Sequence, residues 1–113
     1  MRTLIVLVVG LMVFGCAKSL EKKVAGTYEA KIGEDAIRMV ILENGVVEEY
    51  INGKKGIKYM WKIIDKEVYI EDNYGEITIV RINACGSLTA IAVVIEGKRE
   101  EAPKNEQITF KKI

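Results

Sequence analysis

The sequence predicts an all-β domain of eight antiparallel strands in an up-and-down meander that closes into a small barrel. From Gly26 onward, short runs rich in β-branched and aromatic residues recur at a spacing of about 8–12 residues, which is typical of barrels and sandwiches. No segment shows a capped apolar period of 3.6 residues, apart from a helical turn near Ser19–Lys23. Closure is favoured because it removes the exposed edges of a meander.

Turn residues separate the predicted strands. Asn44 with Gly45, and Asn52 with Gly53, supply the positive φ angles that tight hairpins require. The longest break, Gly97–Glu106, is charged and is expected to be a loop before the last strand. The eight runs are Gly26–Ile32, Ala36–Glu43, Val46–Ile51, Lys58–Asp65, Glu67–Glu71, Glu76–Ile82, Leu88–Ile95 and Gln107–Ile113.

Alternation within the runs separates a buried face from a wet one. A barrel of eight strands is just wide enough to be filled by side chains or to hold one small ligand. Because these strands are short, we expect a mostly filled interior with a shallow pocket at one mouth. The interior candidates include Tyr28, Ile37, Met39, Tyr59, Trp61, Ile77 and Ile79.

The N-terminal segment is predicted to be a signal peptide, residues 1–15, in a signal helix that is not part of the fold. A charged start at Arg2 precedes the apolar run Leu4–Phe14. This run is too short for a membrane span of roughly 20 residues, but it falls within the range of about 7–15 residues of a signal-peptide core.

Val13-Phe14-Gly15-Cys16 resembles the lipobox of bacterial lipoproteins. The resemblance implies diacylglycerol transfer to the Cys16 sulfur, cleavage after Gly15, and acylation of the new amino terminus by a fatty acid such as palmitate. The alternative is an ordinary secretory signal in which Cys16 is incidental. The expected location is the bacterial cell envelope, on the periplasmic face of the outer membrane where one exists, because no Asp follows Cys16.

Composition limits the mature chain to one domain. We expect residues 16–25 to be the lipidated cysteine and a tether, and residues 26–113 to be the barrel. Loss of Arg2 from 17 basic residues leaves 16, which balance the 16 acidic ones, so nucleic acid is not an expected partner. With Cys16 acylated, Cys85 is the remaining thiol and is interpreted as a neutral turn residue.

Val24-Ala25-Gly26-Thr27-Tyr28 resembles the opening Gly-x-Trp element of lipocalins and lipocalin-like bacterial lipoproteins, with Tyr28 where tryptophan is usual. The strand that carries Trp61 is similar to the mid-chain strand of small lipocalin-like domains. The resemblance covers Val24–Ile113 as a pattern of strands and implies ligand binding rather than catalysis. The chain is shorter than a typical lipocalin, which argues against a deep cavity.

Several chemistries can be set aside. The sequence contains no histidine, which removes Ser-His-Asp and Cys-His catalysis and His-based zinc sites. A solvated face explains the scattered glutamates better than a glycosidase pair does. A hairpin turn explains Glu71–Glu76 better than a calcium loop does. We therefore expect no catalytic residues, no metal and no cofactor.

The expected function is non-enzymatic binding or interaction in the envelope, with membrane contact through the anchor. The candidate binding residues are Tyr28 and Trp61, together with Arg81, which is in phase with Ile77 and Ile79 and is placed at a barrel rim. Their expected partner is a small apolar or anionic ligand or an envelope protein. The alternative is a structural or inhibitory protein that acts through surface loops such as Gly97–Glu106, without a small-molecule ligand.

Overall fold

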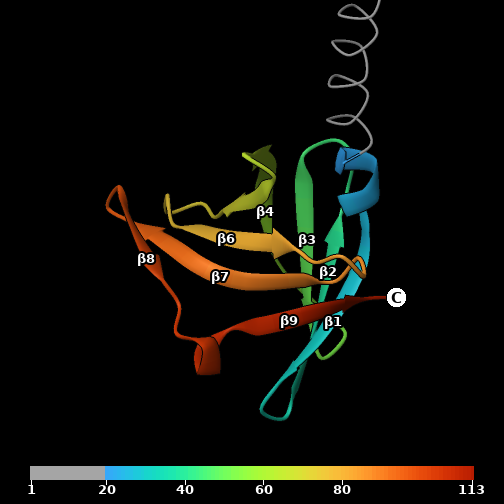
Figure 1. The fold of residues 1–113 in the computed structure, drawn as a ribbon. Helices are drawn as coiled ribbons and strands as arrows, with labels where there is room; N and C mark the ends of the chain where they lie inside the picture. The colour runs from blue at the N-terminus through green and yellow to red at the C-terminus, as the bar shows by residue number, and fades with distance from the viewer. Residues whose placement is uncertain (1–19) are drawn as a thin grey trace, which may run out of the picture.

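The computed structural model describes residues 20–113 and confirms the all-β class (Figure 1). The signal segment 1–15, Cys16 and the first part of the tether lie outside the described residues. Nine strands form one sheet: β1 (Gly26–Ile32), β2 (Asp35–Ile41), β3 (Val46–Ile51), β4 (Lys54–Ile64), β5 (Glu67–Glu71), β6 (Ile77–Ile82), β7 (Leu88–Ile95), β8 (Lys98–Glu101) and β9 (Ile108–Lys112), with a short 3-10 helix, η1 (Lys104–Glu106), between the last two.

Eight of the strands close into the predicted antiparallel barrel. Strands β1 to β7 pair in sequence, β7 then pairs with β9, and β9 pairs with β1 through Tyr28 opposite Lys112. The Asn52-Gly53 hairpin has the expected positive φ angles, 52° and 82°, whereas at the other predicted turn only Gly45 has one, 90°, and Asn44 does not. Consecutive pairing and tight turns therefore carry most of the topology, as the meander prediction required.

The prediction of a loop over Gly97–Glu106 was wrong. The segment contains β8, which pairs with β7 from Ala92 to Ile95, and the 3-10 helix η1. A tight turn at Glu96 and Gly97, both with positive φ, makes this hairpin possible. All four residues of β8 are charged and exposed, which protects the free edge of the strand from pairing with another chain.

Strand β7 pairs with two different strands along the same edge. Its first residues, Leu88–Ala90, pair with β9, and its last ones pair with β8. The change occurs at Ile91, which has no partner on β6 because Ile79 faces Ala92 and Val80 faces Ala90. Such a bulge bends a strand and increases its twist. β8 thus diverges from the barrel, as Figure 1 shows at the end of the long β7.

Side chains fill the barrel interior. Tyr28, Val47, Val68 and Leu88 are fully buried. The cluster also contains Val24, Met39, Ile41, Trp61, Ile70 and Val80. The filled interior agrees with the width expected for eight strands.

Ile77, Ile79 and Arg81 do not face the interior, contrary to expectation. Their alternate neighbour Val80 belongs to the interior cluster. Ile79 is fully buried in a second cluster with Ile91 and Ala92, with Tyr69, Ile77 and Val94 packed around it. Ile77, Ile79 and Arg81 do lie on the same face of β6, as predicted, but this face is the outside of the barrel. Because the outer face of β6 is also apolar, its pattern in the sequence is the same as that of an interior face.

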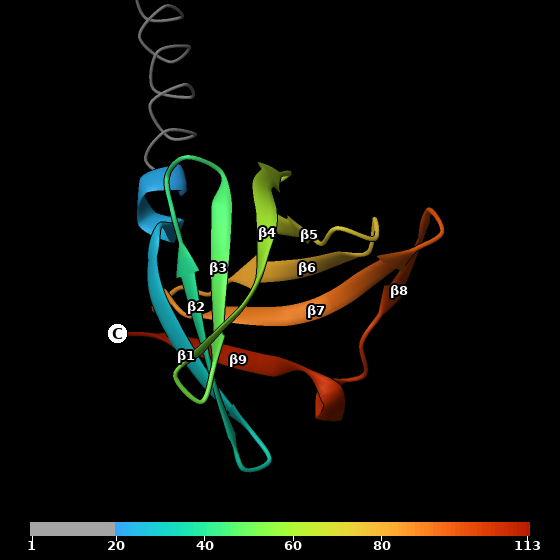
Figure 2. The same cartoon turned by 180° about the vertical axis from the view of Figure 1, so that it is seen from behind.

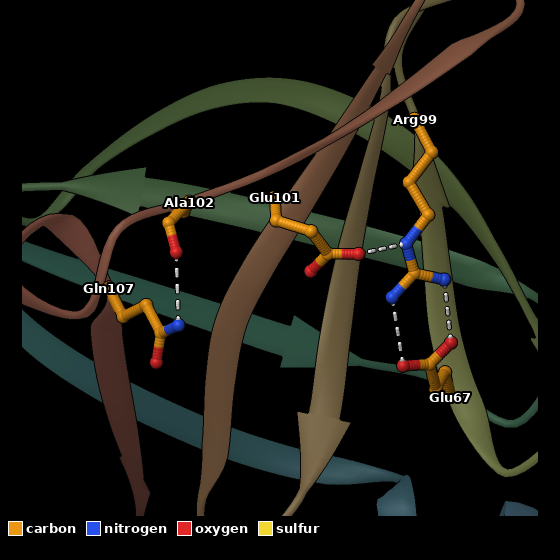
Figure 3. A network of polar contacts seen from close by, with 5 residues as sticks. All are labelled: Glu67, Arg99, Glu101, Ala102 and Gln107. Atoms are coloured by element: carbon orange, nitrogen blue, oxygen red, sulfur yellow. Dashed lines mark hydrogen bonds and ion pairs between the residues drawn. The ribbon is translucent and has the colours of Figure 1, made fainter.

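Arg99 links β8 to the outer face of β5 (Figure 3). Its guanidinium donates to both carboxylate oxygens of Glu67, at 3.1 and 3.3 Å, and its Nε donates to Glu101 at 2.6 Å. These hydrogen bonds raise the pKa of Arg99 above its ordinary value, and the one to Glu67 contributes most. Gln107 Nε2 donates to the Ala102 carbonyl at 3.1 Å, and Ala102 N donates to Ile91 O at 2.7 Å. The β8 segment is therefore fastened at both ends.

The N-terminal part of the domain begins before Gly26. Residues 20–24 form a helical turn, and its last residue, Val24, is 1% exposed in the interior cluster. The expected tether thus includes a residue that packs as core. Figure 2 shows this turn in blue at the opposite end of the molecule from the tip of the β1–β2 hairpin.

Candidate functional site

A depression of about 680 Å³ opens at the end of the barrel that carries the N-terminal helical turn. Four parts of the chain converge there: residues before β1, the β4–β5 turn, the β6–β7 turn and the end of β9. We call this depression the basic mouth. It is lined by Leu20, Lys23, Tyr28, Lys66, Ile82, Asn83, Ala84, Gly86 and Lys112.

Local backbone geometry fixes the backbone positions of the three lysines that line the basic mouth, Lys23, Lys66 and Lys112. Lys66 lies in a two-residue turn in which Asp65 and Lys66 both have positive φ, 50° and 66°. Such turns match the twist of an antiparallel hairpin. Lys23 lies in the helical turn of residues 20–24, and Lys112 is the last residue of β9. Each lysine therefore projects from a defined element.

Lys112 is held against the floor of the basic mouth. Its Nζ donates to the carbonyl oxygen of Lys23 at 2.7 Å and lies 5.7 Å from the centroid of the Tyr28 ring. A cation at this distance from an aromatic face is attracted to it. A Cβ atom at Gly26 would lie 2.7 Å from Lys112 Cε, and Gly26 has φ of +148°. Glycine at position 26 therefore leaves room for the lysine.

Tyr28 forms the closed bottom of the site. The side chain is fully buried, and its hydroxyl donates to the Val24 carbonyl at 2.6 Å. Burial raises the pKa of Tyr28. The hydroxyl therefore stays protonated and structural, and the ring presents its face to Lys112.

The lining carries positive charge without compensation. It contains three lysines and no acidic residue. Within residues 20–113, the ion pairs are those of Arg38 with Glu29, Lys55 with Glu48, and Arg99 with Glu67 and Glu101, so none involves these lysines. Leu20 and Ile82, both half-buried, add apolar surface above the buried Tyr28 ring. The site suits an anionic group attached to an apolar portion.

Arg81 supports the neighbouring turn from outside the basic mouth. It is exposed, and its Nε donates to Asn83 Oδ1 at 3.1 Å. Asn83 Nδ2 in turn donates to Ser87 Oγ at 3.0 Å and Thr89 Oγ1 at 2.8 Å. The amide is thus occupied by its own turn, so lysine side chains are the groups in the lining that remain for an anion.

The three predicted binding residues do not converge. Tyr28 lies in the lining, as a buried floor residue. Trp61 lies in the core, where its Nε1 donates to the Leu42 carbonyl at 2.7 Å, and it does not line the depression. Arg81 lies on the outer wall. Sequence alternation placed the two aromatic residues inward correctly, but it could not distinguish the inner face of β6 from its apolar outer face.

The lysines were missed because they belong to no common motif and are far apart in the sequence. Lys23, Lys66 and Lys112 lie in different parts of the chain. The pairing of β9 with β1 brings the last one beside the first, and the turn after β4 adds the middle one. A meander with turns at alternating ends would have placed the β4–β5 turn and the chain ends at the same mouth.

Cys85 lies in the turn that supplies Ala84 and Gly86 to the lining. The thiol is exposed, with its sulfur 3.1 Å from Ser87 Oγ. Hydrogen bonding to Ser87 lowers the pKa of Cys85. Its position makes the thiol a natural reporter for the basic mouth.

Toward the other end of the barrel, the Tyr59 hydroxyl donates to Glu49 Oε1 at 3.2 Å. The pKa of Tyr59 is raised to about 12, mainly by burial and to a smaller extent by the negative charge of Glu49. This contact pairs two polar side chains within the barrel rather than presenting them to a ligand.

Residues 20–113 contain no cluster of three or more acidic or cysteine side chains that could hold a metal ion. In the same part of the chain, no helix has the length and apolar character needed to cross a membrane. Comparisons of the chain with protein-family models, with curated proteins and with solved structures gave no match, so its site is interpreted from its own geometry.

Proposed function

We propose that the protein is a lipid-anchored, non-enzymatic binding module of the bacterial cell envelope that binds its ligand at the basic mouth. The observation that carries this proposal is the set of three lysines around a partly apolar depression whose lining contains no acidic residue. The lining offers no carboxylate, thiol or serine hydroxyl, which supports binding rather than turnover. The filled interior supports a site at the mouth rather than a deep cavity.

Native mass spectrometry tests the binding function. The full chain, purified from bacterial membranes in mild detergent, is expected to carry an added mass that is lost under denaturing conditions. Lys66→Glu should reduce the occupied fraction, because it replaces one of three uncompensated cations by an anion. Lys62→Glu, on the outer wall of β4, makes the same change in net charge and should leave the occupancy unchanged.

Two results would count against this function. An unchanged mass in every preparation would remove the evidence for a carried ligand. An added mass that survives Lys66→Glu and Lys23→Glu together would place the ligand elsewhere on the protein.

The anchor is tested at Cys16. Cys16→Ser is expected to abolish acylation and leave the precursor uncleaved, because the thiol is the acceptor in the lipobox reaction. Two or three acyl chains, at about 0.8 kcal/mol per buried CH₂, make a stable anchor. Intact-mass analysis of the membrane fraction should show the acyl mass in the parent protein alone. An identical, non-acylated mass for parent and variant would contradict the lipoprotein assignment.

The alternative, action through a surface loop, is less well supported. The segment that was expected to protrude, Gly97–Glu106, contains a strand and a 3-10 helix, and Arg99 fastens it to the barrel wall. The basic mouth gathers three lysines around one depression whose lining contains no acidic residue, and this supports it over the loop as the binding site.

A further inference from the structure

Building on the proposed function, we infer that the group bound at the basic mouth is the headgroup of an acidic phospholipid in the membrane that holds the anchor. The barrel would then stand with this mouth against the membrane surface. The inference depends on three features of the site: its charge, its position relative to Cys16, and its apolar floor.

Charge selects the class of headgroup. Lys23, Lys66 and Lys112 surround a lining without carboxylates, so a phosphate diester with net negative charge is attracted and a zwitterionic headgroup gains much less. All three lysines are exposed, but Lys112 is held by its hydrogen bond to the Lys23 carbonyl, whereas the Lys23 and Lys66 side chains make no ion pair within residues 20–113. The site thus offers one ammonium group in a fixed position, that of Lys112, and two whose side chains can adjust to a ligand.

The position of the site favours a lipid of the same membrane. Leu20 lies in the lining, and Cys16 precedes it by four residues. Four residues of extended chain reach at most about 14 Å. An acyl anchor at Cys16 therefore keeps the basic mouth within about 14 Å plus a side-chain length of the headgroup layer. A soluble anion would not need this proximity.

The apolar part of the lining suits the carbon atoms of a lipid headgroup. Leu20 and Ile82 are half-buried and line the depression beside the Tyr28 ring. Leu20 and Ile82 can contact the carbon atoms of a headgroup that enters the depression, while the flexible lysine side chains bring their ammonium groups to the phosphate.

The size of the effect follows from the number of lysines. Each basic residue near an anionic surface contributes about fivefold in binding, so three contribute on the order of 100-fold. Because the barrel is already tethered to the membrane, this factor raises the ratio of docked to freely tumbling domains. Reversing the charge of one lysine should lower the ratio of docked to free domains by at least about fivefold.

Cys85 allows docking to be measured on the full chain. The protein is reconstituted in vesicles of pure phosphatidylcholine, or of phosphatidylcholine with phosphatidylglycerol, and Cys85 carries a fluorophore that is quenched by a headgroup-labelled lipid. Quenching should be stronger in the vesicles with phosphatidylglycerol and should fall to the neutral-vesicle level in about 1 M salt, where the Debye length is near 3 Å. Cys85→Ser should take up no label when Cys16 is acylated.

Matched variants separate docking from general charge attraction. Lys66→Glu and Lys23→Glu should each weaken the quenching caused by phosphatidylglycerol, and Lys62→Glu should not. Equal quenching in both kinds of vesicle, or equal effects of Lys62→Glu and Lys66→Glu, would overturn the inference. If native mass spectrometry then still found a ligand that depends on Lys66, the proposed binding function would stand with a different ligand; if it found none, both would fail.

Discussion

Trp61→Ala is expected to lower the free energy of unfolding by about 3–5 kcal/mol. The indole is 8% exposed and packs in the interior cluster with Tyr28 and Leu88. Its Nε1 also donates to the Leu42 carbonyl at 2.7 Å. The substitution creates a large cavity and removes the partner of that carbonyl, and the two losses act in the same direction.

Trp61→Phe is the matched control, because it keeps an aromatic ring in the core but removes the donor to Leu42. We expect it to cost about 1–3 kcal/mol, less than the alanine variant. Urea unfolding in mild non-ionic detergent, followed by circular dichroism, measures both values. A loss below about 1 kcal/mol for Trp61→Ala would show that the ring contributes little to the core and would restore it as a candidate binding residue.

The barrel itself was predictable because its signals are local. Turn residues such as Asn52-Gly53 fix hairpins, and alternation along a strand separates two faces. The inner positions of β1 and β4, among them Tyr28 and Trp61, followed directly from these rules. Strand β8 was missed because Lys98–Glu101 is wholly charged and resembles a loop; it forms because β7 has a free edge beyond Ile91.

The site was much less predictable than the fold. Charge balance over the whole chain concealed a local excess, because the three lysines of the basic mouth come from segments that meet only after the barrel closes. Two of the three candidate residues, Tyr28 and Trp61, were instead aromatic and in phase with buried positions, and such residues usually belong to the core. Arg81 shows the same limit: period-two alternation assigns residues to one of two faces, but it does not say which face is the interior when both are apolar.

Ile79→Ala is expected to cost about 2–5 kcal/mol, although Ile79 faces away from the barrel interior. The side chain is fully buried in the outer cluster with Ile91 and Ala92. On a barrel wall open to water, the same substitution would change stability by about 0.5 kcal/mol or less. A core-like loss would therefore show that the outer face of β5, β6 and β7 forms a second packed layer.

Ile95→Ala provides the comparison on β7, because Ile95 is 42% exposed and lies outside the cluster. It should cost less than about 1 kcal/mol. The Ile79 loss should also be coupled to the link between Arg99 and Glu67, since β8 is fastened across the same face. In Arg99→Ala, amides of β8 should exchange faster with solvent, and the effect of Ile79→Ala should shrink. Independent, additive effects of the two substitutions would mean that the outer cluster is buried without help from β8.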